Sequence, residues 1–193
     1  MARQSRKEQA RYAILVVDML NDFVYGKLKC ARAARVIPNI RRLVAAAHEK
    51  GVPVFFCNDE HLPIDTYEMK LWGPHAMKGT KGAQTIEELR PDDRVDYVIP
   101  KRAYSAFDGT GLDRALKGVY GGKGANAVVI TGLHTNICDR HTAYDAFVRN
   151  LDIVVAEDGV DAFTEHDHVS GLEYMKNVYG AKVKTTSNII RSL

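Results

Sequence analysis

Three residue types that can cooperate in acyl transfer each follow an apolar run in this sequence. Asp18 ends YAILVVD, Lys101 ends RVDYVIPK, and Cys138 stands in TGLHTNICDRHTAYDAF just after the run AVVI. A free cysteine, with a pKa of about 8.5, is mostly protonated at neutral pH, although only the thiolate attacks a carbonyl. The ammonium group of Lys101 favours that anion, and Asp18 can accept the proton and later return it to a leaving amine. Together they predict cleavage of an amide or an ester.

The elements that must position these residues alternate along the chain. Apolar runs predict strands over 12–18, 51–59, 94–101, 125–132, 151–158 and 181–186, and helical patterns lie at 36–51, 111–121, 135–150 and 168–180. Continuous apolar runs suit parallel strands that are covered on both faces. The sequence therefore predicts an α/β fold, a three-layer doubly wound, Rossmann-like parallel sheet with helices on both faces.

The predicted sheet decides between a structural and a catalytic interpretation of Asp18, Lys101 and Cys138. Taken singly, Cys138 is a small core residue, Asp18 a helix cap and Lys101 a solvated charge at a strand end. In open parallel sheets, however, ligands bind beyond the carboxyl ends of the strands. Because all three residues follow strands, we expect them to meet there. Asp59 and His61, a pair of metal-binding types, follow the second strand to the same edge.

The helix over 135–150 is expected to present one apolar face to the sheet. Ile137, Tyr144 and Phe147 follow helical spacing and are predicted to point inward, while Asp139 and Arg140 are predicted to point outward.

Length and composition narrow the class of protein. The 193 residues suit a single domain over 1–193, in which the polar stretch 1–11 forms an N-terminal arm. A net charge of +3 gives no reason to expect a nucleic-acid partner, and no apolar run reaches the roughly 20 residues that span a bilayer. Three widely spaced cysteines do not suggest a disulfide framework, so a cytoplasmic location is expected.

Three longer stretches carry a resemblance to a known family. LVVDMLNDF (15–23), KRAYSAFDGTGLD (101–113) and GLHTNICDRHTAYDA (132–146) resemble the signature stretches of the isochorismatase-like cysteine hydrolases, with family spacing from about residue 12 to 186. That superfamily includes nicotinamidases, N-carbamoylsarcosine amidases, ureidoacrylate amidohydrolases and isochorismatases. The resemblance implies a six-stranded parallel sheet in the order 3-2-1-4-5-6, and a homo-oligomer, either a dimer or a tetramer.

The resemblance also implies roles for individual residues. The catalytic triad falls on Asp18, Lys101 and Cys138, and the oxyanion hole on the backbone N–H groups of His134 and Cys138. A cis peptide is implied between Leu133 and His134. The implied substrate pocket comprises Phe23, Trp72, Tyr104 and Leu133.

A metal site is implied as well. Asp59, His61 and His75 match the metal ligands of nicotinamidases. One carboxylate and two imidazoles suit a divalent metal, with zinc as the first expectation and iron or manganese as alternatives.

The implied activity is that of a cysteine amidohydrolase that cleaves the C–N bond of a small carboxamide through a thioester and releases ammonia. Nicotinamide is the leading substrate, and an N-carbamoyl or ureido compound is the alternative. A different class, a non-catalytic ligand-binding protein on the same fold, also stays open. An NAD-binding oxidoreductase would need a glycine-rich first turn, which LVVDMLNDF does not provide.

Overall fold

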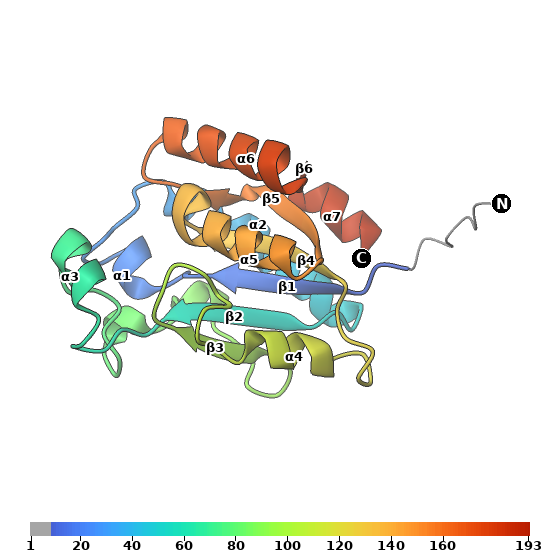
Figure 1. Ribbon diagram of the computed structural model, residues 1–193, viewed down its shortest axis with the longest axis horizontal. Helices are drawn as coiled ribbons and strands as arrows, with labels where there is room; N and C mark the ends of the chain where they lie inside the picture. The colour runs from blue at the N-terminus through green and yellow to red at the C-terminus, as the bar shows by residue number, and fades with distance from the viewer. Residues whose placement is uncertain (1–8) are drawn as a thin grey trace.

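The computed structural model describes residues 9–193, which form a parallel sheet flanked by helices (Figure 1). Neighbouring strands are parallel throughout, and their order is β3-β2-β1-β4-β5-β6. Both the six-stranded parallel sheet and its order confirm the prediction. The strands are β1 Tyr12–Val17, β2 Val54–Asp59, β3 Tyr97–Lys101, β4 Ala127–Leu133, β5 Asp152–Asp161 and β6 Lys182–Lys184.

Helices connect these strands, and the longer ones lie where the sequence predicts them. Pro38 stands in the first turn of α2 and Gly51, with a φ of +66°, follows its end, which are the positions that proline and glycine favour at helix ends. The predicted helices correspond to α2 Ile37–Glu49, α4 Leu112–Gly118, α5 Arg140–Val148 and α6 Glu165–Tyr179. The sequence did not predict α1 Asn21–Val24, α3 Thr66–Trp72, α7 Thr186–Ser192 or the 3₁₀ turns Ala33–Arg35, Lys81–Ala83 and Glu87–Leu89. The first turn of the helix predicted over 135–150 is a π-helical turn, Thr135–Asp139.

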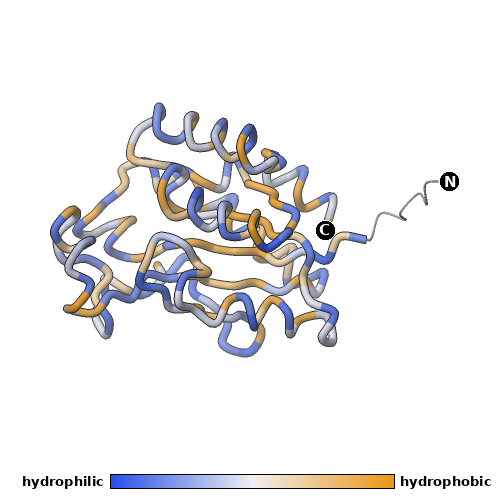
Figure 2. The backbone as a smooth tube through the Cα atoms, viewed as in Figure 1, coloured by the Kyte–Doolittle hydropathy of each residue, from blue (hydrophilic) through white to orange (hydrophobic). Residues whose placement is uncertain are grey.

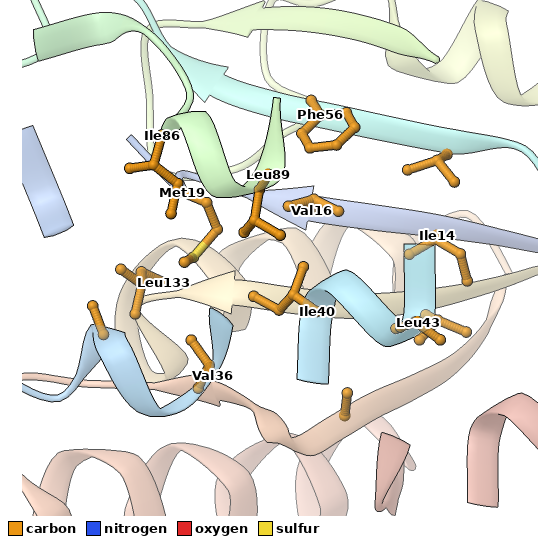
Figure 3. Close-up of a cluster of buried hydrophobic side chains, with 14 of the residues drawn as sticks. Ile14, Val16, Met19, Val36, Ile40, Leu43, Phe56, Ile86, Leu89 and Leu133 are labelled. Atoms are coloured by element: carbon orange, nitrogen blue, oxygen red, sulfur yellow. The ribbon is translucent and has the colours of Figure 1, made fainter. Parts of the chain in front are cut away.

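The sheet separates two apolar layers because successive strand residues point to opposite faces. On β1, Ile14 and Val16 pack on the side of α2, whereas Leu15 and Val17 pack on the side of α4, α5 and α6. Figure 3 shows the first of these layers, and Figure 2 shows the hydrophobic colouring concentrated along the central strands. Burial on both faces explains why the central strands are continuously apolar in sequence.

The exposed face of α5 contradicts the prediction. Tyr144 and Phe147, expected inside, are 49% and 48% exposed, and Asp139, expected outside, is fully buried. The cause is the π-helical turn before α5, in which the N–H of Asp139 donates to the carbonyl of His134, five residues earlier. Such a turn rotates the side chains before it relative to those after it, so one 3.6-residue period does not describe both.

Several predictions concern the chain as a whole. Residues 1–8 of the predicted arm lie outside the described residues, and the single domain over 1–193 stays a prediction. Among the described residues, no helix is long and apolar enough to cross a membrane. Cys30, Cys57 and Cys138 are all free thiols in buried positions.

Candidate active site

The carboxyl ends of β1 to β4 meet at one edge of the sheet. Val17 is paired with Cys57 of β2 and with Gly132 of β4, so Asp18 emerges between the ends of these two strands. Asp59 and Lys101 stand opposite each other where β2 and β3 end. The arrowheads of β1 and β2 in Figure 1 point to this edge, beside α1 and α3.

Unusual backbone conformations shape this edge. Gly132 has a φ of +122°, and a Cβ added to it would lie 2.0 Å from the carbonyl oxygen of Val17, so only glycine allows β4 to approach β1 here. Asp18 has a φ of +53°, in the left-handed region that aspartate tolerates better than most residues. The peptide between Leu133 and His134 is cis, as the resemblance implied.

Lys101 joins two carboxylates at the centre of the site. Its Nζ lies 2.7 Å from Oδ2 of Asp18 and donates to Oδ1 of Asp59 at 2.5 Å. The backbone N–H of Asp59 donates to Oδ1 of Asp18 at 2.7 Å. All three side chains are at most 2% exposed, and a buried charge is tolerated when it is paired in this way.

Cys138 lies beside this ionic group. It belongs to the π-helical turn Thr135–Asp139 and is 5% exposed. Its Sγ and a carboxylate oxygen from each of Asp18 and Asp59 all lie within 4.8 Å of one another. The structure therefore brings together the three residues that the sequence singled out for catalysis.

The electrostatics of the group indicate where its protons reside. Burial raises the pKa of Asp18 to about 7, and Asp59 adds to this rise while Lys101 limits it. Burial opposes the charge of Lys101, but Asp18 and Asp59 outweigh it and raise the pKa of Lys101 well above its ordinary value. Burial also raises the pKa of the Cys138 thiol well above its usual range, and Lys101 offsets only part of this. Burial thus favours the protonated thiol in the free protein, whereas Lys101 favours the thiolate.

A second group of side chains adjoins the first and shares Asp59 with it. Donor atoms of Asp59, His61, Glu68 and His75 all lie within 4.8 Å of one another. Nε2 of His61 is 3.5 Å from Oδ2 of Asp59 and 3.6 Å from Oε2 of Glu68. Glu68 was missed from the sequence because it lies on the short helix α3, and no motif distinguishes it from a surface acid.

These residues fit a divalent metal ion. Among the described residues, Nε2 of His61 has no hydrogen-bond partner although it is buried, and carboxylate oxygens of Asp59 and Glu68 lie 3.5 and 3.6 Å from it. Two ligand atoms that are each about 2.1 Å from a tetrahedral zinc ion lie about 3.4 Å apart, so the spacing is that of ligands around an ion. Nδ1 of His75 lies 2.7 Å from the carbonyl oxygen of Gly73, and an N–H donated there leaves Nε2 for the metal. Burial lowers the pKa of His75, which favours the neutral imidazole that metals bind.

A small cavity opens onto both groups. Its lining includes Cys138 together with Asp59, Glu68 and His75. A ligand in this space can thus contact the nucleophile and the metal-binding residues together. Among the described residues that line the cavity there is no lysine or arginine.

Aromatic side chains form most of the remaining wall. Phe23, Trp72 and Tyr104, which were expected in the substrate pocket, all line the cavity, and Nε1 of Trp72 donates to the hydroxyl of Tyr104 at 3.0 Å. Phe163 also lines it, and its ring stacks on His134 at 4.1 Å between centroids. Burial lowers the pKa of His134 to about 4, so this wall is uncharged.

The structure places some wall residues differently from the prediction. Leu133, which was expected in the pocket, does not line the cavity but is fully buried in the core near Met19 (Figure 3). Leu28, Ile137 and Phe163 line the cavity instead, in addition to the expected aromatic residues. Leu28 and Phe163 come from loops after α1 and β5, where nothing in the sequence marks an apolar residue as a wall.

The fold and the site define a parallel α/β protein with an acid, an amine and a thiol at its strand ends, an arrangement suited to hydrolysis. The chain belongs to the isochorismatase family, whose domain matches residues 12–188, and is a hydrolase of that family. It is 34% identical over 182 residues to the uncharacterised isochorismatase family protein PncA of Bacillus subtilis (strain 168). That alignment covers 89% of this chain and 97% of the relative.

Solved structures of family members superpose closely. N-carbamoylsarcosine amidase from Thermoplasma acidophilum is 41% identical with a TM-score of 0.84, and the match covers 91% of this chain and 96% of the other. Nicotinamidase PncA from Bacillus subtilis is 32% identical with a TM-score of 0.81, and the match covers 90% and 98% respectively. The chain is thus similar to amidases of two different specificities.

Proposed function

We propose that the protein is a cysteine amidohydrolase that cleaves the C–N bond of a small carboxamide through a thioester and releases ammonia. The observation that carries this proposal is that Cys138 and three metal-binding side chains line one cavity together. Behind its wall, Asp18 lies next to the thiol, and burial raises its pKa to about 7, which suits a general base at neutral pH.

In the first half of the reaction, Sγ of Cys138 forms a bond to the carboxamide carbon while Asp18 takes the thiol proton. The backbone N–H groups of His134 and Cys138 bind the oxyanion that develops on the carbonyl oxygen. The C–N bond then breaks, Asp18 returns the proton to the nitrogen, and ammonia leaves. Lys101, 2.7 Å from Asp18, holds the carboxylate in place and stabilises its charge.

In the second half, water attacks the thioester carbon while Asp18 takes one of its protons. The C–S bond breaks, and the proton returns from Asp18 to the sulfur as the carboxylic acid departs. Asp18 already lies beside the thiol, so deprotonation can accompany the attack although burial raises the pKa of Cys138.

The metal-binding residues serve recognition. Asp59, His61, Glu68 and His75 would hold a divalent ion, for which zinc, iron and manganese are the candidates, and that ion supplies a positive site for a lone pair of the substrate. Asp59 also accepts a hydrogen bond from Lys101, which pairs with Asp18 beside the thiol. These contacts hold the metal-binding residues at a fixed distance from Cys138.

Nicotinamide is the substrate that these features favour most. Phe23, Trp72 and Phe163 offer flat apolar surface to an aromatic ring, and the ring nitrogen can approach the metal-binding residues. The likeness to nicotinamidase PncA supports the same choice.

A second candidate is an N-carbamoyl compound, which the 41% identity to N-carbamoylsarcosine amidase favours. N-carbamoylsarcosine carries a carboxylate. Because no lysine or arginine lines the described cavity to pair with it, an uncharged carboxamide is the better match.

Ammonia release from nicotinamide and from N-carbamoylsarcosine, measured side by side with zinc-loaded protein, tests the proposal. We expect faster release from nicotinamide, and no detectable release from either compound with Cys138→Ala. Equal activity of Cys138→Ala and native protein would refute covalent catalysis. Inactivity of the native protein on both compounds, with ligand binding retained, would instead indicate a non-catalytic binding protein.

A further inference from the structure

Asp22 is a buried acid of the LVVDMLNDF stretch that the reaction does not use. It lies on α1, only 8% of its surface is exposed, and its side chain points away from bulk solvent into the body of the protein. A buried carboxylate is expected to have a defined set of donors.

The shorter of the two hydrogen bonds that Asp22 accepts comes from the segment that carries His75. Oδ2 of Asp22 accepts the backbone N–H of Ala76 at 2.8 Å, and Oδ1 accepts that of Lys27 at 3.5 Å. The carbonyl of Ala76 in turn accepts the N–H of His61 at 2.9 Å. Ala76 is therefore held from both sides, by Asp22 and by the metal-binding residue His61.

This clamp maintains an unfavourable backbone conformation. Ala76 is fully buried and has a φ of +41°, in a region that an alanine adopts only when its surroundings enforce it. His75 directly precedes it, so the path of the chain at Ala76 decides where the imidazole of His75 lies. The bond from His75 to Gly73 orients the ring, but it does not fix the segment relative to the sheet.

The space around Asp22 is shaped for a carboxylate. A Cβ added to Gly82 would lie 2.2 Å from Oδ2 of Asp22, and one added to Gly26 would lie 2.6 Å from Oδ1. Two glycines on different segments thus leave the room that the carboxylate occupies.

We propose that Asp22 is a positioning residue of the metal site: through Ala76 it fixes His75 at the distance from Asp59, His61 and Glu68 that a divalent ion requires. This inference rests on the metal site of the proposed function. Asp22 itself contacts neither the metal nor the substrate, so its removal should weaken metal binding before it affects the thiol.

The affinity for Zn²⁺, measured by competition with a chromophoric chelator, tests the inference on the full chain. We expect Asp22→Ala to lower the affinity about 10- to 100-fold, as loss of residues that orient metal ligands does. Asp22→Asn keeps one oxygen that can accept from Ala76, so its loss should be smaller. The absorption spectrum of bound Co²⁺ should change in the same order.

Asp158 provides a matched control. It accepts the N–H of Thr186 at 2.6 Å and its hydroxyl at 2.7 Å, and so holds a backbone segment far from the site in sequence. Asp158→Ala should lower the unfolding midpoint and leave Zn²⁺ affinity unchanged. Native affinity in Asp22→Ala, or an equal loss in both variants, would overturn the inference. Where Asp22→Ala does not fold, the affinities of Asp22→Asn and Asp158→Asn are compared in the same way.

Native protein that binds no Zn²⁺ would overturn the metal site and this inference together. The hydrolase proposal would still be decided separately, by ammonia release from native protein and from Cys138→Ala. The two proposals can therefore fail independently.

Discussion

Among single residues, Lys101 connects two carboxylates with different tasks. In the proposed reaction Asp18 takes the proton of the thiol, whereas Asp59 directs one oxygen to Lys101 and the other toward His61. Burying three charges is unfavourable unless they satisfy one another, and the short contacts here do so. The same contacts place the proposed metal site and the nucleophile at a fixed distance, because a shift of Lys101 would displace both acids.

His134 provides a prediction about pH and stability. Burial lowers its pKa to about 4, whereas an unfolded chain takes up this proton near pH 6.5. Between these values the unfolded state binds more protons, so the stability of the native protein falls as the pH falls. From pH 7 to pH 5 this residue alone should cost about 2 kcal/mol of unfolding free energy.

His134→Phe should remove that part of the acid-side loss, because phenylalanine can stack on Phe163 without a titratable group. Urea unfolding of both proteins at pH 7 and pH 5 measures the difference. Parallel losses in the native protein and the variant would contradict the assignment of a neutral buried imidazole.

At the scale of secondary-structure elements, the closest approach of β4 to β1 depends on Gly132. Alanine there would place its Cβ 2.0 Å from the carbonyl oxygen of Val17, at a φ of +122°. We expect Gly132→Ala to lower the free energy of unfolding by at least about 3 kcal/mol and to displace Asp18, which follows Val17. Gly118→Ala, at the end of α4 with open space around it, is the matched control and should leave stability nearly unchanged. Comparable urea midpoints for the two variants would show that the backbone adapts.

The strands and the longer helices could be predicted from sequence because each carries its own periodic signal. The face of α5 could not, since the π-helical turn ahead of it changes the register at Asp139. The short helices α1 and α3 span too few residues for a period to emerge.

The same distinction applies to the site. Asp18, Lys101 and Cys138 follow predicted strands, so the topology alone brought them to one edge. Glu68 and Phe163 reach the cavity from a short helix and a loop, whose paths depend on tertiary contacts. The extent to which burial opposes the charge of the Cys138 thiolate could not be predicted either, because it depends on the depth of burial.

Considered as a whole, the molecule has a buried central sheet and a short, largely exposed helix α3. None of the residues of α3 is fully buried, and Ile64, Tyr67 and Leu71 in this region are 71%, 87% and 67% exposed. A helix of seven residues has little stability of its own. Glu68 lies on α3, and with Asp59, His61 and His75 it would attach the helix to the sheet through a bound ion.

Removal of the metal should therefore first destabilise α3 and then lower the stability of the whole protein. With Zn²⁺ at 100 times its Kd, binding adds about 2.7 kcal/mol of stability, which for a chain of this size raises the Tm by roughly 5–10 °C. Chelation should reverse this shift and make the segment 62–78 the first target of limited proteolysis. His75→Ala should lose both effects of Zn²⁺, whereas Cys138→Ala should keep them, because its side chain is not among the four metal-binding residues. If neither the Tm nor the cleavage pattern changes with Zn²⁺ or with chelator, α3 is held by its apolar contacts alone.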